Sequence, residues 1–468
     1  MSTQAARISL KPRGRRSGRT ASAAFSGDAV RIPLLLWVIH WLLVQIPATL
    51  AYHFGTSLAD QGTYIFRGRE IEGTASWAYG TVNVNGVSQP APWNPSELSG
   101  LAHWLVEPMR LWDGSWYRLV AIFGYDPSKS ANAAFFPLYP KLMEWISDLT
   151  GMSVETAGYL ISNVAFLGAL LVLYRLITFD FDPVIAKRTL WIVILFPTSF
   201  FFSAVYTESL FLLLAATTLY AARRSDWLLA GIVGLFAALT RSAGVMLLAP
   251  MAVIFLQQYG WNPRRWFPNA IPAALPALGP VIFGWILTRS GMKFDDWIHQ
   301  QWQWNRFSAN PIETFDCTLN GCTAQIRSWG SSYEGYVWPI DWGWIGDILS
   351  NPTWSHFTSP AWRDRAARGD VLEFVVTIAA FALVLIGIRK LPFYYTAYTV
   401  PALLVPLFSP SSVHPLMSMP RFVLPLFPLF VMLALLIRDR RLGVVLGVLS
   451  TIGLVLLTMQ FASWYWVS

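Results

Sequence analysis

Asp113 is the residue whose type and surroundings point most directly to chemistry. It stands in residues 111–117, which read LWDGSWY, so aromatic side chains flank the acid on both sides. A carboxylate close to a hydroxyl group can accept its proton while the oxygen attacks a neighbouring carbon. The rings of Trp112, Trp116 and Tyr117 can hold a sugar or a lipid beside that acid. We therefore predict that Asp113 is a general base and that these three aromatic residues bind substrate.

Four further ionisable residues stand at the ends of apolar segments, namely Glu208, Arg241, His414 and Arg421. Guanidinium groups match phosphate oxygens bidentately, so Arg241 and Arg421 could stabilise a departing phosphate. Ionisable groups at membrane depth are costly and often mark function. The structural alternatives are an acid that favours a helix N-terminus, for Glu208, and a plain turn residue, for Arg241.

The composition is that of a membrane protein. Apolar residues make up 54% of the 468 residues and charged residues only 13%, with a mean hydropathy of +0.45. Several apolar runs reach the roughly 20 residues that cross a hydrocarbon core. The net charge of +8 comes mainly from a basic tail before Asp28, which indicates topology and not nucleic-acid binding. Residues 1–30 are predicted to be a disordered cytoplasmic tail, with a cleaved signal peptide as the alternative.

Eleven apolar segments are predicted to be membrane helices, within an expected total of about 10–12. They are 32–52, 155–177, 189–203, 206–222, 227–240, 243–257, 268–288, 371–388, 392–408, 421–437 and 442–462. A break at residues 240–242 keeps all basic clusters on the cytoplasmic side, whereas one continuous helix over 227–257 would not. The same rule makes 189–222 a hairpin that bends near residues 203–208. Asp113 and the four ionisable residues above then share the extracytoplasmic face.

Two large extracytoplasmic loops are predicted, at 53–154 and 289–370, within a single transmembrane domain over 31–468. In the first, apolar residues at helical spacing from Phe135 to Leu149 predict a helix that lies in the membrane interface. The second is rich in tryptophan, which indicates an interfacial belt or, alternatively, a sugar-stacking surface. These tryptophans are Trp297, Trp302, Trp304, Trp329, Trp338, Trp342, Trp344, Trp354 and Trp362.

The two cysteines, Cys317 and Cys322, lie in this second loop. We predict a small disulfide hairpin if the loop faces an oxidising compartment. A metal site is not predicted, because no other cysteine is present and the six histidines are scattered. Walker, GxGxxG and HExxH motifs are missing from the sequence, and the first loop has no DxD pair. ATP-driven transport and metal-dependent diphosphate-sugar chemistry therefore lack support.

The motifs from residue 111 onward resemble the PIG-V family, which contains the second mannosyltransferase of GPI-anchor synthesis and bacterial relatives. The resemblance is densest over residues 111–245. The matching positions are Trp112-Asp113, Trp116-Tyr117, Gly124-Tyr125, residues 135–140, residues 161–163, Pro197, Ser199, Phe200, Tyr206-Thr207-Glu208-Ser209, Thr240-Arg241, Gly244 and Pro420-Arg421-Phe422.

This resemblance implies a GT-C membrane fold and an inverting transfer of mannose from polyprenyl- or dolichyl-phosphate-mannose on the extracytoplasmic side. We predict that the transfer needs no cofactor and no metal. The resemblance assigns Asp113 as the base, Glu208 to substrate hydroxyls or to orienting Asp113, and Arg241 to donor phosphate. Tyr206, in the same turn as Glu208, is included among the substrate-binding residues, as are His414 and Arg421. The expected partners are membrane lipids, the lipid-linked donor and a lipid or glycan acceptor.

Two alternatives stay open at this point. A flippase for lipid-linked sugars would also expose aromatic and basic residues, although it should carry functional groups at both faces or at mid-depth. A GT-C enzyme for another sugar is the second. The excess of arginine over lysine favours a bacterial plasma membrane, with the N-terminus in the cytoplasm.

Overall fold

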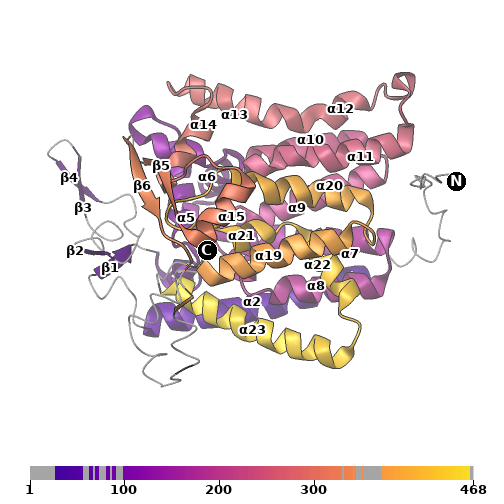
Figure 1. The fold of residues 1–468 in the computed structure, drawn as a ribbon, viewed down its shortest axis with the longest axis horizontal. Coiled ribbons are helices and arrows are strands. Elements are labelled where there is room, and N and C mark those ends of the chain that lie inside the picture. The colour runs from indigo at the N-terminus through magenta and orange to yellow at the C-terminus, as the bar shows by residue number, and fades with distance from the viewer. Residues whose placement is uncertain are drawn as a thin grey trace.

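The computed structural model describes residues 27–55, 98–328, 331–340 and 370–463, four short strands between residues 63 and 90, and a few single positions. Within these described residues, six helices are long and apolar enough to cross a membrane, by length and composition. The fold is that of an all-α polytopic membrane protein, as predicted (Figure 1). The basic tail lies outside the described residues, as do Trp329, Trp344, Trp354 and Trp362.

All eleven predicted apolar segments are helical over most of their length. They correspond to α2 (Asp28–Phe54), α7 (Val154–Asp180), α8 (Pro183–Leu195), α9 (Glu208–Arg223), α10 (Trp227–Thr240), α11 (Leu248–Tyr259), α12 and α13 (Ala270–Ala274 and Leu278–Arg289), α19 (Asp370–Gly387), α20 (Phe393–Leu404), α21 and α22 (Met419–Val423 and Phe427–Leu436) and α23 (Arg440–Ala462). Helix α7 packs against α2, α6, α8 and α9, and so lies inside the bundle.

Both predicted chain reversals are present. Helix α10 ends at Thr240, Arg241 is extended, and the 3-10 turn η5 (Ser242–Leu247) leads into α11. Between α8 and α9 the chain turns through η4 (Ser199–Phe202). A Cβ atom added to Gly244 would lie 2.3 Å from the carbonyl oxygen of Ala237, so only glycine lets η5 pack this closely on α10.

Basic clusters gather at one end of the bundle. Lys187 pairs with Asp28 at 3.4 Å, and Arg223 pairs with Asp180 at 2.8 Å, so α2, α7, α8 and α9 have ends there. Helix α9 begins at Glu208 and ends at Arg223, which places Glu208 at the opposite end. Figure 1 shows α5, α6, α15 and the strands at that opposite end.

The first large loop is mostly helical. It contains α4 (Gly100–Leu105), η2 (Glu107–Met109), α5 (Asp113–Phe123), η3 (Pro127–Ala134) and α6 (Leu138–Thr150). The predicted interfacial helix is α6, which is too short at 13 residues to cross a bilayer. It starts at Leu138 and not at Phe135, because Pro137 disfavours a helical backbone at the residue before it, Phe136.

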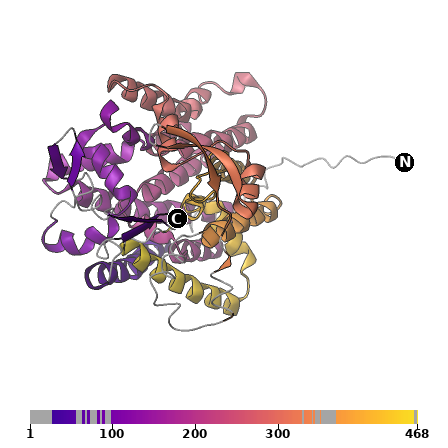
Figure 2. The same ribbon diagram turned by 60° about the vertical axis from the view of Figure 1, so that its left-hand side comes forward.

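Three antiparallel hairpins stand in the two loops. They are β1–β2 (Thr63–Phe66, Arg69–Glu72), β3–β4 (Thr81–Val84, Val87–Pro90) and β5–β6 (Cys322–Ser328, Ser331–Val337). The β5–β6 strands lie at left in Figure 1 and in front of the helices in Figure 2, so they cover one end of the bundle. Two short segments, α14 (Asp296–His299) and η8 (Gln300–Trp304), precede them.

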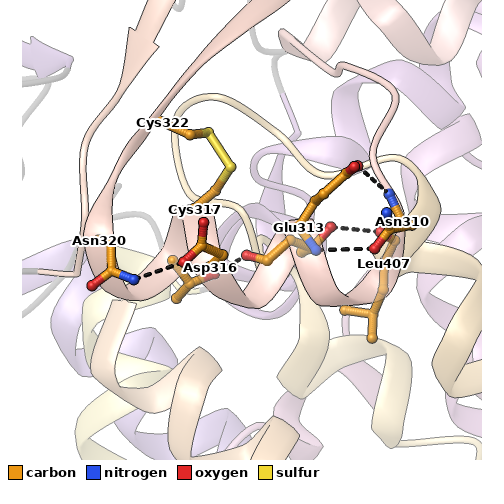
Figure 3. The surroundings of a disulfide bond; sticks show 9 residues. Asn310, Glu313, Asp316, Cys317, Asn320, Cys322 and Leu407 are labelled. Atoms are coloured by element: carbon orange, nitrogen blue, oxygen red, sulfur yellow. Dashed lines mark hydrogen bonds between the residues drawn. A yellow bond between two sulfur atoms is a disulfide. The ribbon is translucent and has the colours of Figure 1, made fainter.

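The predicted disulfide is present and joins α15 (Pro311–Asn320) to β5, as Figure 3 shows. Cys317 and Cys322 have Cα atoms 4.9 Å apart. Asn310 and Glu313 form a capping box that fixes the start of α15. Thr314 of the same helix donates to the Leu407 carbonyl at 2.6 Å, so α15 is anchored to the chain that follows α20.

Candidate active site

Asp113 is the first residue of α5, and its position is set by the residues on either side. Trp112 adopts φ 58° and ψ −120°, a backbone conformation that side-chain-bearing residues rarely take. The Asp113 backbone N–H donates to the Tyr206 hydroxyl at 3.0 Å, and that hydroxyl donates to the Leu111 carbonyl at 3.2 Å. Tyr206 therefore holds the turn that presents Asp113.

Arg421 joins the two carboxylates of the site. Its Nη1 lies 2.5 Å from Asp113 Oδ2, and its Nε donates to Glu208 Oε1. The guanidinium also lies over the Tyr206 ring, 4.7 Å from the ring centre. One cation is thus shared between acids that are 95 residues apart in sequence, and the arrangement depends on planar guanidinium geometry.

Arg241 completes the cluster from the break after α10. Its Nη1 donates to Glu208 Oε1 and, at 3.2 Å, to the Thr207 hydroxyl. The Tyr117 hydroxyl lies 3.1 Å from the same Thr207 oxygen. Asp113, Glu208, Arg241 and Arg421 come from four separate elements, and we call them the Asp113 cluster.

The Asp113 cluster is mostly buried, but part of it remains accessible to solvent. Glu208 is fully buried, and the side chains of Asp113 and Arg241 are 17% and 14% exposed. Glu208 Oε2 is buried and has no hydrogen-bond partner among the described residues. An unpaired carboxylate oxygen in an enclosed site is costly and is suited to accept a hydrogen bond from a bound ligand.

The predicted aromatic residues have different surroundings. Tyr117 is buried and packs edge-on against Phe135 and Tyr139, at 5.1 and 5.2 Å between ring centres. Burial raises the pKa of the Tyr117 phenol to about 12, so it stays protonated near neutral pH. Trp116 stacks on Phe135 at 5.7 Å and is partly exposed, as is Trp112. Tyr117 therefore supports the site from within the core.

A second buried ion network braces α5, and the sequence analysis missed it. Arg110 pairs with Glu107 at 2.6 Å, and Arg118 pairs with Glu155 at 2.5 Å. Arg110 also lies 3.9 Å from Glu155, which links the two pairs. Because Arg118 belongs to α5 and Glu155 to α7, this network fixes the helix that carries Asp113. Their spacing in sequence resembles any loop charge pattern, so no local signal identified them.

Arg306 is a further cation that the sequence did not single out. Its Nη1 donates to the Ser409 carbonyl at 2.5 Å. Burial lowers the pKa of Arg306 to about 10, opposed by the charges of Asp113 and Glu373, so the guanidinium stays charged at neutral pH. Arg306 thus adds a third guanidinium charge beside Asp113.

His414 lies in a neighbouring cluster. It contacts Asp370, the first residue of α19, and lines one cavity with Asp370 and Glu373. Glu373 Oε1 accepts the Ser418 backbone N–H at 3.0 Å, just before α21, which carries Arg421. Glu373 was missed because residues 371–388 were treated only as an apolar span, and Asp370 because it was counted as the end of the predicted loop 289–370.

A comparison with protein-family models supports the resemblance noted in the sequence. The model of the mannosyltransferase (PIG-V) family matches residues 81–262. The resemblance to the PIG-V family is confirmed. The matched region is less than half of the chain but contains Asp113, Glu208 and Arg241, whereas Arg421 lies beyond it. The PIG-V match supports a mannosyltransferase in a membrane-spanning protein. No match was found among curated proteins or among solved structures.

Proposed function

We propose that this protein transfers mannose from polyprenyl-phosphate-mannose to a lipid or glycan acceptor, with inversion at the anomeric carbon. The Asp113 cluster carries this proposal. It combines a carboxylate for the acceptor hydroxyl with guanidinium groups for the phosphate. Of these residues, Asp113 and Arg241 lie within the PIG-V match and Arg421 lies beyond it. Neither a cofactor nor a metal ion takes part in the transfer step.

Asp113 acts as the general base in this mechanism. In the protein without substrate its Oδ2 is paired with Arg421. A donor phosphate is a competing anion for that guanidinium, and its binding would release Asp113 to accept the acceptor hydroxyl proton. The hydroxyl oxygen then attacks the anomeric carbon and the bond from that carbon to the phosphate oxygen breaks. Arg421 stabilises the departing phosphate, which Arg241 already binds in the donor.

The charge of the site favours a monophosphate donor. Two guanidinium groups, those of Arg241 and Arg421, contact the carboxylates of Asp113 and Glu208, and the charge of Arg306 also acts on Asp113. Arg306 also acts on the Glu373 carboxylate, so these charges nearly balance, and a donor with the single negative charge of a lipid–phosphate–sugar diester fits better than a diphosphate. Glu208 Oε2, which has no partner in the described part of the chain, would accept a mannose hydroxyl.

The same arrangement supports one orientation in the membrane. Basic clusters at the Arg223 end of α9 fit the cytoplasmic side, and the Glu208 end then faces outward. We infer a bacterial plasma membrane with the site outside the cytoplasm. All four members of the Asp113 cluster lie at one end of the bundle, which favours an enzyme over a flippase.

The test is an assay of membranes with labelled polyprenyl-phosphate-mannose, in which the labelled product is identified. Wild type should produce labelled glycolipid or glycan, and Asp113→Asn should reduce transfer by about 100-fold to 10,000-fold, the range for loss of a general base. Appearance of intact donor on the opposite leaflet, without transfer, would favour the flippase. Transfer of a different sugar in preference to mannose would correct the donor.

A further inference from the structure

We propose that Asp370, Glu373 and His414 bind one divalent metal ion, with Zn²⁺ or Mn²⁺ as the matching class. One oxygen or nitrogen atom from each of the three residues lies within 4.8 Å of the other two. The site would be separate from the transfer chemistry, and the proposal does not depend on the proposed function.

The local fold brings the three groups together from two segments. Asp370 and Glu373 are three residues apart at the start of α19, so they lie on one face of that helix. His414 reaches them from the loop before α21, where its Nδ1 contacts Asp370. The three residues line one small cavity, beside Thr318 of α15 and Trp338 after β6. Small side-chain rotations bring all three within reach of one ion at about 2.0–2.2 Å.

Two carboxylates and one imidazole face one another in this enclosed cluster. Glu373 is 1% exposed, and the side chains of Asp370 and His414 are 18% and 13% exposed. Buried carboxylates are normally paired with cations or coordinate metals. The charges of His414 and Arg306 act on Glu373, and the charge of Arg306 also acts on Asp113. A divalent cation would neutralise both acids at once.

The type of ion follows from the ligands. Calcium and magnesium sites are built from oxygen ligands, whereas imidazole nitrogen favours zinc and other transition metals. A mixed set of one nitrogen and two carboxylates therefore suits Zn²⁺ or Mn²⁺, with Zn²⁺ bound more tightly. The contact from the Ser418 backbone to Glu373 links the ion to the start of α21, so the ion would hold the segment that carries Arg421.

The experiment measures metal content and thermal stability of the full-length protein in detergent. After incubation with Zn²⁺ or Mn²⁺ and removal of free metal, wild type should retain about one ion per chain and show a higher Tm than in EDTA. His414→Gln and Glu373→Gln should weaken binding by at least about tenfold, since each removes a ligand. His299→Gln is the matched control, because His299 pairs with Asp295 at 2.9 Å on the exposed surface.

Two results would overturn the proposal. One is a wild-type protein that retains no ion and shows no change in Tm with either metal. The other is retention of the ion by both ligand variants at the wild-type level, which would place it elsewhere. Equal Tm values for wild type and variants in EDTA show that the variants fold, so lost binding is then a property of the site.

Discussion

Helix α9 carries a buried ion cluster at each end, and the two clusters differ in one respect. At its last residue, Arg223 pairs with Asp180, whose other oxygen accepts hydrogen bonds from Tyr394 and Tyr395. One acid meets one guanidinium there, and both carboxylate oxygens have donors. At its first residue, Glu208 shares one oxygen between two arginines while the other has no partner among the described residues.

The difference separates a structural cluster from a site that can take a ligand. Both clusters join segments that are distant in sequence, so burial and convergence alone do not indicate function. In the Asp180 cluster every carboxylate oxygen already has a donor, so the cluster stabilises the fold and offers no acceptor to a substrate. Two guanidinium groups that an anion can compete for, and a carboxylate oxygen without a partner among the described residues, favour an anionic ligand with hydroxyl groups.

The largest expected effect after loss of the base is that of Arg421→Lys. An ammonium group cannot contact Asp113 and Glu208 in the planar geometry that Arg421 provides, so one acid loses its partner. We expect turnover of the labelled donor to fall by about 100-fold or more. Arg223→Lys, at the Asp180 end of α9, is the matched control and should keep turnover within a few-fold of wild type. Equal losses in both variants would remove the distinction between the two ends.

Glu208→Gln should have the next largest effect, because Glu208 Oε2 is proposed to accept a substrate hydroxyl. The change keeps the shape of the side chain but removes the negative charge that Arg421 and Arg241 share. We expect kcat/KM for the donor to fall by about 10-fold to 100-fold, as for a charged hydrogen bond. Steady-state kinetics with purified protein measure this effect, and unchanged kinetics would return Glu208 to a structural role.

Arg241→Lys should act mainly on donor binding. A lysine keeps the positive charge but contacts either Thr207 or Glu208 and not both as one planar group. We expect KM for the donor to rise about tenfold while kcat changes less, in line with an interaction made already with bound substrate. A loss confined to kcat would instead place Arg241 in stabilisation of the transition state.

The smallest expected effect is that of the disulfide. Replacing Cys317 and Cys322 together with serine removes a short cross-link between α15 and β5. The free energy of unfolding should fall by about 2 kcal/mol, and turnover should stay near the wild-type level. Denaturant unfolding and the transfer assay on the same preparation measure both quantities. A large loss of turnover would show that the β5–β6 hairpin takes part in catalysis.

Sequence patterns predicted the membrane helices and singled out Asp113, because both depend on local signals. Apolar length located the membrane segments, and positive-inside counting located the break at Arg241. The PIG-V motifs identified Asp113, Glu208 and Arg241 before their contacts were known.

The partners of these residues could not be predicted in the same way. Arg306 and Glu373 come from a polar loop and an apolar helix with no motif, and only the folded chain brings them beside the site. The β5–β6 hairpin was missed because tryptophan dominated the interpretation of that loop. Long-range pairing leaves little trace in a single sequence, whereas local periodicity leaves a strong one.

The most direct test compares Asp113→Asn with Asp180→Asn in turnover, donor binding and Tm. Asp113 belongs to the cluster at the first residue of α9, and Asp180 belongs to the cluster at its last residue. We predict that Asp113→Asn loses at least about 100-fold in kcat while donor binding and Tm stay near wild type. Asp180→Asn should keep kcat within a few-fold and lose about 1–3 kcal/mol of stability. An Asp113→Asn protein that keeps more than a few per cent of wild-type turnover would contradict the account.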